Sequence, residues 1–386
     1  MNRDVNMMNP TAGVAANIQV GPKKVFITGA AGFVGQYVVA AVLRAGHEVL
    51  ANIRAKTDVE RISWHDHPNV TFVRQDLRQR RGLVDAVAPA DAVIHLAAVK
   101  SGDFYDQFAG TVIATENLLW AMRSAGIKQL VAISTFSVYD FLNMKPKRLL
   151  DENSPIESSP QNRDEYAQTK LIQEQLYRAF AADASEVAEG AKPIQNAVTI
   201  LRPGMIYGRD NLWHALIGAE VGGNRMLKIG GKATLPMTYV ENCAEAIALA
   251  LNAPQAVGQT INLVDDNLPT QKAYLAQLLA YTPEPPKLIP VSWFVMRSVA
   301  NLAWWYNQTF LSGQAKLPGI LVPAKLQGRF KPLKYNNNQA KALLNWAPQY
   351  SLETAFRRSC SALDLVAVPL PDSPEIPEGI PIQVGC

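Results

Sequence analysis

The chain has few charges, few cysteines and no long apolar run. Charged residues make up 18% of its 386 residues, hydrophobic residues make up 48%, and the net charge is +4. The basic residues are scattered, and their densest group, Arg78–Arg81, is typical of a solvated helix start, so no nucleic-acid surface is predicted. Three cysteines without metal-like spacing favour a reduced, cytoplasmic protein with no metal site.

Both ends of the chain lack the patterns of ordered structure. Residues 1–20 are polar and small, without the basic region and apolar core of a secretory signal, and predict a disordered lead-in. Over residues 367–386 prolines recur every few positions, which predicts a disordered, proline-rich tail. No apolar run reaches the roughly 20 residues that a membrane-spanning helix needs.

The strongest pattern is a glycine-rich turn near the N-terminus. The apolar run of residues 24–28 predicts a buried strand, and a helix is predicted from Phe33 onward. Between them, Gly29 permits a tight bend, Gly32 lets the backbone approach a pyrophosphate, and Gly35 lets the helix lie against the strand. The N–H groups and positive dipole at a helix start attract phosphates, so this turn predicts a dinucleotide site.

The end of the second predicted strand, residues 47–54, distinguishes the two nicotinamide cofactors. In such folds an Asp or Glu there binds the ribose diol of NAD, whereas an Arg accommodates the 2′-phosphate of NADP. No acid occupies this position, which instead holds Arg54 and Lys56. A guanidinium binds a phosphate through two parallel hydrogen bonds, so NADP(H) is favoured. NAD(H) remains the alternative, in which Arg54 only begins a solvated loop.

Hydroxyl and amine side chains follow the strand predicted over residues 129–133. Thr135 comes directly after that strand, and Tyr166 and Lys170 are four residues apart on a predicted helix, so they share a face. A nearby ammonium and a positively charged nicotinamide lower the pKa of a phenol, which suits Tyr166 to proton transfer near neutral pH. A hydroxyl from Thr135 would hold the substrate oxygen close to it.

This order of motifs resembles the extended branch of the short-chain dehydrogenase/reductases, the NAD(P)-dependent epimerase/dehydratase family. The resemblance covers about residues 23–365 and is most specific in GAAGFVG at 29–35, HLAA at 95–98 and RPGMIYG at 202–208. It implies an α/β Rossmann fold, a doubly wound parallel sheet, with Thr135, Tyr166 and Lys170 as the catalytic triad. It also implies a set of cofactor-binding residues, namely Gly29, Ala31, Gly32, Phe33, Val34, Gly35, Arg54, Asp76, Leu77, Leu96, Ala97, Ala98, Tyr166, Lys170 and Pro203.

Several positions near these motifs have other expected roles. His95 is expected to be a packed strand-end histidine rather than a catalyst, and Arg202 to anchor its loop. Asn117 is expected to order its helix or to have a structural role. Asp140 stands where the family usually has glycine, which is expected to alter the loop over the site.

A cofactor domain is predicted over residues 21–204 and a smaller substrate lobe over residues 205–366. Residues 259–265 are expected to return to the main sheet, so the two parts interleave. Many nucleotide-sugar epimerases have an arginine for the substrate diphosphate before the strand predicted here at 235–240, but this chain has Leu235. The resemblance therefore shifts toward 3β-hydroxysteroid dehydrogenases and dihydroflavonol-type reductases, unless Lys232 or Arg225 substitutes for that arginine.

The predicted protein is an NAD(P)-dependent oxidoreductase. It would transfer a hydride to or from a secondary alcohol or ketone of a weakly charged, steroid- or lipid-like substrate. One alternative is a nucleotide-sugar epimerase or dehydratase that retains its cofactor, and another is a catalytically silent nucleotide-binding protein. The resemblance implies a homodimer through helices near 106–125 and 163–183.

Residues 289–310 are rich in aromatic side chains and interrupted by one charge, Arg297. We expect a helix that is buried or that contacts a second subunit. A hydrophobic lid over the substrate and a peripheral helix on a membrane surface are the alternatives.

Overall fold

The computed structural model describes residues 18–370 except 186–193, 313 and 316. Most of the lead-in and tail that the sequence predicts to be disordered therefore lies outside the described residues. Within the described part of the chain, no helix is long and apolar enough to cross a membrane.

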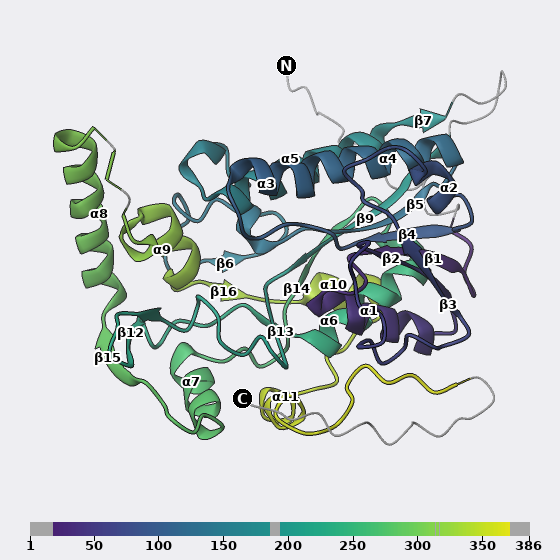
Figure 1. Ribbon diagram of the computed structural model, residues 1–386. Helices are drawn as coiled ribbons and strands as arrows, with labels where there is room; N and C mark the ends of the chain where they lie inside the picture. The colour runs from purple at the N-terminus through teal and green to yellow at the C-terminus, as the bar shows by residue number, and fades with distance from the viewer. Residues whose placement is uncertain (1–17, 186–193, 313, 316, 371–386) are drawn as a thin grey trace, which may run out of the picture.

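A seven-stranded parallel sheet forms the centre of the molecule (Figure 1). Its strand order is β14-β9-β5-β4-β1-β2-β3, and every neighbouring pair is parallel. The order reverses between β1 and β4, which makes the sheet doubly wound and marks the edge where ligands bind in such folds. The strands are β1 (Lys24–Thr28), β2 (Glu48–Ile53), β3 (Val70–Arg74), β4 (Ala92–His95), β5 (Gln129–Ile133), β9 (Ala197–Pro203) and β14 (Thr260–Leu263).

Helices cover both faces of this sheet, so its central strands are buried on both sides (Figure 1). In β1, Val25 and Ile27 face one core cluster while Phe26 faces the other, as the two-residue period of a strand requires. One face is covered by α1 (Phe33–Arg44), α6 (Val240–Leu249) and α10 (Asn338–Leu344), and the other by α2 (Leu83–Val87), α4 (Ala114–Ala125) and α5 (Glu165–Ala182).

Two elements of this half end or begin abruptly. Helix α2 begins directly after Gly82, whose left-handed conformation (φ 74°) separates the helix from the preceding turn. Strand β4 ends at His95. The N–H groups of Leu96 and Ala97 turn away from the ladder and donate to the Thr28 hydroxyl.

The chain before α4 is not a single regular α-helix. A short helix, α3 (Phe104–Phe108), runs into a π-helical turn, η2 (Ala109–Ile113), before α4. The loop after β4 packs closely against this turn. Gly110 permits the contact, because a Cβ at this position would lie 2.2 Å from a methyl of Val99. The Val99 N–H also donates to the Thr111 hydroxyl.

The remaining elements form a smaller lobe beyond the carboxyl ends of the strands (Figure 1). The strand predicted at 235–240 is β13 (Met237–Tyr239), and Tyr239 precedes α6, so Glu241 and Asn242 lie in the first turn of α6 rather than capping it. The other elements of the lobe are β6 (Leu149–Leu150), β10 (Met205–Tyr207), β11 (Ala219–Glu220), β12 (Arg225–Ile229), α7 (Gln271–Ala280), β15 (Lys287–Val291), α8 (Trp293–Phe310), α9 (Pro323–Phe330), β16 (Lys334–Tyr335) and α11 (Leu352–Ser359). The short strands β7 (Ala184–Ser185) and β8 (Ile194–Gln195) pair with each other between α5 and β9, away from this lobe (Figure 1).

Of the two alternatives expected for 289–310, a helix buried within the chain is wrong, and contact with a second subunit stays a prediction. Residues 287–291 form β15, and α8 then projects along the outer edge of the lobe (Figure 1). Phe294 and Leu302 are each 64% exposed. Only a narrow stripe that includes Trp293, Met296 and Ala300 is buried.

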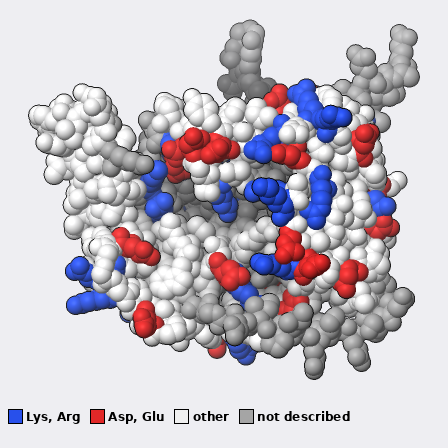
Figure 2. All heavy atoms as spheres, in the orientation of Figure 1, with Lys and Arg blue, Asp and Glu red and all other residues white. Residues whose placement is uncertain are grey.

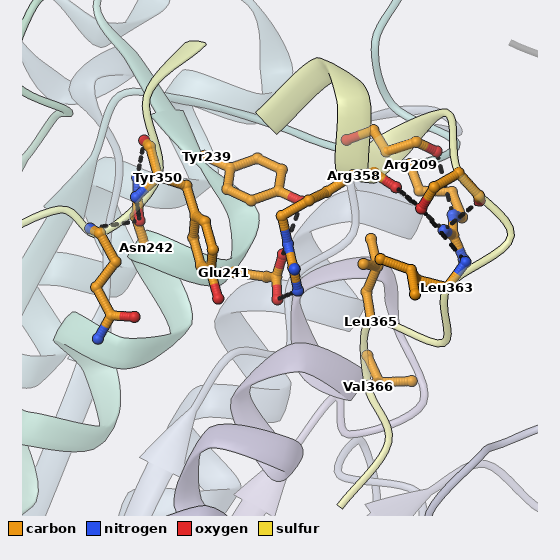
Figure 3. A network of polar contacts seen from close by, with 12 residues as sticks. Arg209, Tyr239, Glu241, Asn242, Tyr350, Arg358, Leu363, Leu365 and Val366 are labelled. Atoms are coloured by element: carbon orange, nitrogen blue, oxygen red, sulfur yellow. Dashed lines mark hydrogen bonds and ion pairs between the residues drawn. The ribbon is translucent and has the colours of Figure 1, made fainter. Parts of the chain in front are cut away.

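A polar network fastens the C-terminal segment to α6 (Figure 3). Arg358 donates from Nε and Nη2 to the two carboxylate oxygens of Glu241, at 2.8 Å each, and its guanidinium lies over the Tyr350 ring. Arg209 donates to backbone carbonyls at the end of α11, where a cation is favoured by the helix dipole. Asn242 accepts from the N–H groups of Gln349 and Tyr350. These contacts explain why Glu241 and Asn242 do not serve as caps.

Replacing Gly35 tests how closely α1 approaches β1. A Cβ at this position would lie 2.0 Å from the carbonyl oxygen of Gly29, so we expect Gly35→Ala to lower the free energy of unfolding by about 1–3 kcal/mol or more. The control is Gly328→Ala in α9, where the added Cβ would meet only atoms of Phe141 and Arg163 at 3.7–3.8 Å. Urea unfolding checks both variants. Equal stability for the two would contradict the packing described here.

Candidate active site

Helix α5 presents a row of polar side chains to the carboxyl edge of the sheet. Tyr166, Lys170 and Glu174 are four residues apart and therefore share one face. Asp164 caps the helix by accepting from the N–H of Ala167 at 3.0 Å. The cap and the buried positions along this face fix the direction in which the three side chains point.

The Thr135 hydroxyl lies close enough to the Tyr166 phenol to favour its ionised form. Thr135 follows β5 and also accepts from the N–H of Ser137 at 3.2 Å. Burial raises the pKa of Tyr166 to about 12, against a smaller lowering by the Thr135 hydroxyl and a further rise from Asp164. The lowering by the Lys170 ammonium that the sequence predicted is therefore not seen, because burial dominates and only the Thr135 hydroxyl lowers this pKa. At neutral pH the phenol therefore holds its proton and is suited to act as an acid.

Lys170 is anchored by two of its three N–H groups. It donates to the carbonyl oxygen of Ile133, at the end of β5, at 2.6 Å, and it also donates to the Gln173 side chain. Burial lowers the pKa of Lys170 to about 7; Glu174 opposes this shift and Lys100 adds to it. One N–H remains available to a ligand beside the Tyr166 phenol.

Beneath Lys170 lies a buried chain of neutral hydrogen bonds. The Gln173 amide donates to the Thr115 hydroxyl at 2.8 Å, and that hydroxyl donates to the Thr111 carbonyl. His95 Nε2 lies 2.9 Å from the same hydroxyl, whose hydrogen is already used, so Nε2 must be the donor and Nδ1 accepts from Thr28 at 2.7 Å. Burial, with the Lys170 charge, lowers the pKa of His95 to about 3. His95 is thus a neutral, fully buried strand-end histidine, as expected from the sequence.

An ion pair is buried beside this chain. The Arg202 guanidinium donates to Glu174 through two nitrogens and to the Tyr139 hydroxyl, and Ser134 donates to the Glu174 carboxylate at 2.6 Å. Arg202 is 1% exposed and therefore anchors its loop, as predicted. Burial opposes ionisation of Glu174, but hydrogen bonds and charge from Arg202, with hydrogen bonds from Ser134 and Arg178, lower its pKa to about 2.

The glycine turn has the shape that a dinucleotide pyrophosphate requires. Gly29 has φ 70°, and a Cβ there would lie 3.2 Å from the backbone nitrogen of Ala97. The first helical residue is Phe33, and no side chain caps α1 at Gly32, so the first N–H groups of the helix remain available to an anion. The residues present therefore fit the cofactor predicted from the sequence. Ala31 and Val34 lie in the same turn, and Leu96, Ala97 and Ala98 follow β4.

At the other end of this edge, cations surround the position expected for the adenine ribose. Arg54 follows β2 and is exposed, and the Arg74 side chain bonds the carbonyl oxygens of Arg54, Ala55 and Thr57. Asp76 is paired with Arg78 at 2.6 Å. The Arg78 hydrogen bond lowers the pKa of Asp76, against partial burial, and Arg54 adds to this lowering.

Other predicted residues lie nearby in structural roles. Asn117 donates to the Leu77 carbonyl at 3.0 Å and accepts from Arg80, so it ties α4 to the loop after β3. Pro203 ends β9. Asp140 accepts from the backbone and side-chain nitrogens of Asn143 and so closes a turn after Tyr139.

One cation near the site was not predicted from the sequence. Lys100 lies in the loop after β4, and its charge contributes to lowering the pKa of Lys170, so two ammonium groups face one region. Partial burial lowers the pKa of Lys100 although the residue keeps exposed surface, and no acid pairs with it among the described residues. Its position shortly after a central strand is the signal by which the sequence could have indicated it. Figure 2 shows a hollow near the middle of this face, with Lys and Arg side chains beside it.

The position where epimerases place an arginine supplies no cation. Leu235 is buried in the core. Of the two predicted substitutes, Arg225 donates to the carbonyl of Gly222 at an exposed end of β12, and Lys232 is exposed.

The chain is similar to proteins of one large enzyme family. The model of the NAD dependent epimerase/dehydratase family matches residues 25–263. The 2-alkyl-3-oxoalkanoate reductase of Stenotrophomonas maltophilia is 28% identical over 347 residues, 87% of this chain and 98% of that protein. The human sterol-4-alpha-carboxylate 3-dehydrogenase, decarboxylating, is 26% identical over 359 residues, which is 87% of each chain. An undecaprenol-linked N-acetylglucosamine 4-epimerase of Escherichia coli O157:H7 is 29% identical over 62% of this chain and 67% of its own.

Solved structures share the fold at low sequence identity. MoeE5 in complex with UDP-glucuronic acid and NAD has a TM-score of 0.61 and 22% identity, covering 87% of this chain and 97% of its own. A UDP-glucose-4-epimerase from Stenotrophomonas maltophila with bound NAD has a TM-score of 0.63 and 20% identity, covering 87% and 96%. At such identities the likeness shows the fold alone.

The buried ion pair predicts a specific acid sensitivity. Because the pKa of Glu174 is lower in the folded chain than its ordinary 4.5, its contribution to stability is full above that value and is lost as pH falls toward 2. Glu174→Gln leaves the buried Arg202 without a charge partner, so we expect a loss of about 3–5 kcal/mol at pH 7 and a flatter stability curve between pH 5 and 2.

Urea unfolding at a series of pH values measures this effect. The control is Glu48→Gln, which removes an exposed pair with Lys24 and should change stability by about 1 kcal/mol or less. An unchanged acid slope in Glu174→Gln would show that the pair does not stabilise the site.

Proposed function

The chain belongs to the NAD-dependent epimerase/dehydratase family, and we propose that it is an NADP(H)-dependent oxidoreductase acting on a ketone or secondary alcohol. The observation that carries this proposal is the grouping of Thr135, Tyr166 and Lys170 at the carboxyl edge of the sheet. In this proposal residues 21–204 bind the cofactor, and residues 205–366 bind most of the substrate.

In this proposal Thr135 positions the substrate and Tyr166 transfers the proton. The Thr135 hydroxyl holds the substrate oxygen, and the protonated Tyr166 phenol donates to that oxygen when a ketone is reduced. Lys170, fixed by Ile133 and Gln173, supplies a cation that favours the phenolate left behind. When bound along the glycine turn, the nicotinamide cofactor supplies or accepts the hydride.

Support for NADP(H) comes from the charges at the end of β2. Arg54 has no acid partner among the described residues, and Asp76 is already neutralised by Arg78. A 2′-phosphate there would meet guanidinium groups rather than a lone carboxylate, which is the arrangement that favours NADP over NAD.

Calorimetry of Arg54→Ala tests the cofactor preference. We expect the variant to lose about 1–3 kcal/mol of NADP⁺ binding, because charged hydrogen bonds to the phosphate are removed, and to bind NAD⁺ as before. The matched control is Arg61→Ala, an exposed arginine of the same domain, which should leave both affinities unchanged. Wild-type protein that prefers NAD⁺, or retains it on purification, would contradict the preference.

The substrate is proposed to be an oxo or hydroxy acid with a large apolar body. Two full-length relatives are named for substrates that combine an oxygen function at carbon 3 with a nearby carboxylate. In this chain Lys100 is an unpaired ammonium beside the proposed catalytic residues, where it can bind one carboxylate. The absence of a cation at Leu235 disfavours a nucleotide diphosphate.

A comparison of an acid with its ester tests this role. We expect Lys100→Met to raise KM for a 3-oxo fatty acid by about 10- to 100-fold, through loss of a charged hydrogen bond, and to leave KM for its methyl ester unchanged. Tyr166→Phe should instead lower kcat for both substrates by about 10²- to 10⁴-fold. NADPH absorbance follows both rates. Equal losses on acid and ester in Lys100→Met would remove the carboxylate contact.

The second candidate is a nucleotide-sugar epimerase or dehydratase, favoured by the relative that is a 4-epimerase. Such an enzyme retains its cofactor, so the absence of net NADPH turnover together with conversion of a nucleotide sugar would select it.

We also propose that the protein is a homodimer, with its contact through α4 and α5, and that its location is cytoplasmic.

A further inference from the structure

We propose that α8 and the basic segment around it form a docking surface for an anionic lipid bilayer. This proposal concerns a surface away from the sheet edge and does not depend on the reaction. It rests on the exposure of α8, on the charges of the surrounding sequence and on the place of α8 in the fold.

Helix α8 is rich in apolar side chains, yet most of them are uncovered. Its 18 residues contain one charge, Arg297. A stripe that includes Trp293, Met296 and Ala300 packs against Leu326 and Phe330 of α9. The other apolar side chains are exposed, and the largest are Phe294, Val295, Val299, Leu302, Trp304, Trp305, Tyr306 and Phe310.

Such a surface indicates a partner, because large exposed apolar patches mark sites of interaction with proteins or membranes. The exposed set is rich in Trp and Tyr, which combine an apolar ring with a polar atom and suit the boundary between lipid and water. An apolar groove of about 420 Å³ also runs along α8 beside Val299, Leu302 and Tyr306. The projecting end of the helix is white in Figure 2, without charged side chains.

The sequence around α8 contains no acidic residue. Between Glu284 and Glu353 there are eight basic residues and no Asp or Glu. Two of the eight have partners: Lys331 donates to the backbone carbonyls of Phe141 and Leu142, and Lys341 pairs with Asp266. None of the other described basic residues forms an ion pair with a described acid; they are Lys287, Arg297, Lys325, Arg329 and Lys334.

This charge pattern selects the partner. In a two-fold contact the same patch meets itself, so a second copy would bring this acid-free segment against its own like charges. An anionic bilayer instead complements the basic residues while its apolar layer receives the aromatic side chains. A lid is disfavoured because α8 lies at the outer edge of the molecule, away from the hollow (Figures 1 and 2).

The docking surface contacts the segment that comes after β5 and after the proposed catalytic residue Thr135. Lys331, directly after α9, donates to the carbonyls of Phe141 and Leu142. Gly328 of α9 also lies close to the Phe141 ring. Docking through α8 would therefore hold this side of the lobe next to the bilayer.

Vesicle flotation of the full chain tests the proposal. Vesicles of phosphatidylcholine alone are compared with vesicles that also contain about 30% phosphatidylserine. We expect flotation with the anionic vesicles only, weakened by added salt. Trp305→Ser with Phe310→Ser, and separately Lys325→Glu with Arg329→Glu, should lower the bound fraction by about ten-fold or more.

Matched controls remove an exposed ring or charge elsewhere. Tyr105→Ser, in α3, and Arg61→Glu, in the cofactor domain, should bind vesicles like wild type. Absence of flotation with anionic vesicles, or flotation unchanged in both double variants, would overturn the proposal. So would a wild-type dimer, seen by light scattering, that dissociates on the Trp305→Ser, Phe310→Ser change without any vesicle binding.

Discussion

The site depends on a chain of buried polar groups that must all find partners. Lys170, Gln173, Thr115, His95 and Thr28 link α5, α4, β4 and β1 through consecutive hydrogen bonds. Leaving one such group unsatisfied in the interior costs roughly 1–3 kcal/mol, so the elements are held in a single relative position. The proposed catalytic side chains lie next to these hydrogen-bonded groups, so their positions are fixed as well.

The second constraint is electrostatic. Glu174 and Arg202 neutralise each other inside the protein, whereas Lys100 has no acid partner among the described residues and its charge opposes that of Lys170. The loop after β4 therefore carries an excess of positive charge. An excess of this kind is stable only near solvent or a ligand anion, which connects it with the proposed carboxylate substrate.

The local sequence was sufficient to predict the glycine turn and the strand and helix on either side of it. The strand over 24–28 and the helix from Phe33 were predicted at their observed starts, because glycine spacing and apolar runs encode them within a few residues. The spacing of Tyr166 and Lys170 likewise places them on one helical face wherever the helix packs. Lys100 was missed because its relevance depends on how the loop after β4 approaches α5, which is distant in sequence. The burial predicted for 289–310 was wrong because aromatic content does not say what covers a helix.

By itself the sequence determined the order of strands and helices, the glycine turn and the chemistry available at the sheet edge. Those features follow from periodicity and residue type, which act over short distances along the chain. Only the tertiary structure decided the proton positions around His95, the raised pKa of Tyr166, the partner of Arg202 and the exposure of α8. Each of these depends on burial and on neighbours distant in sequence, which no local pattern records.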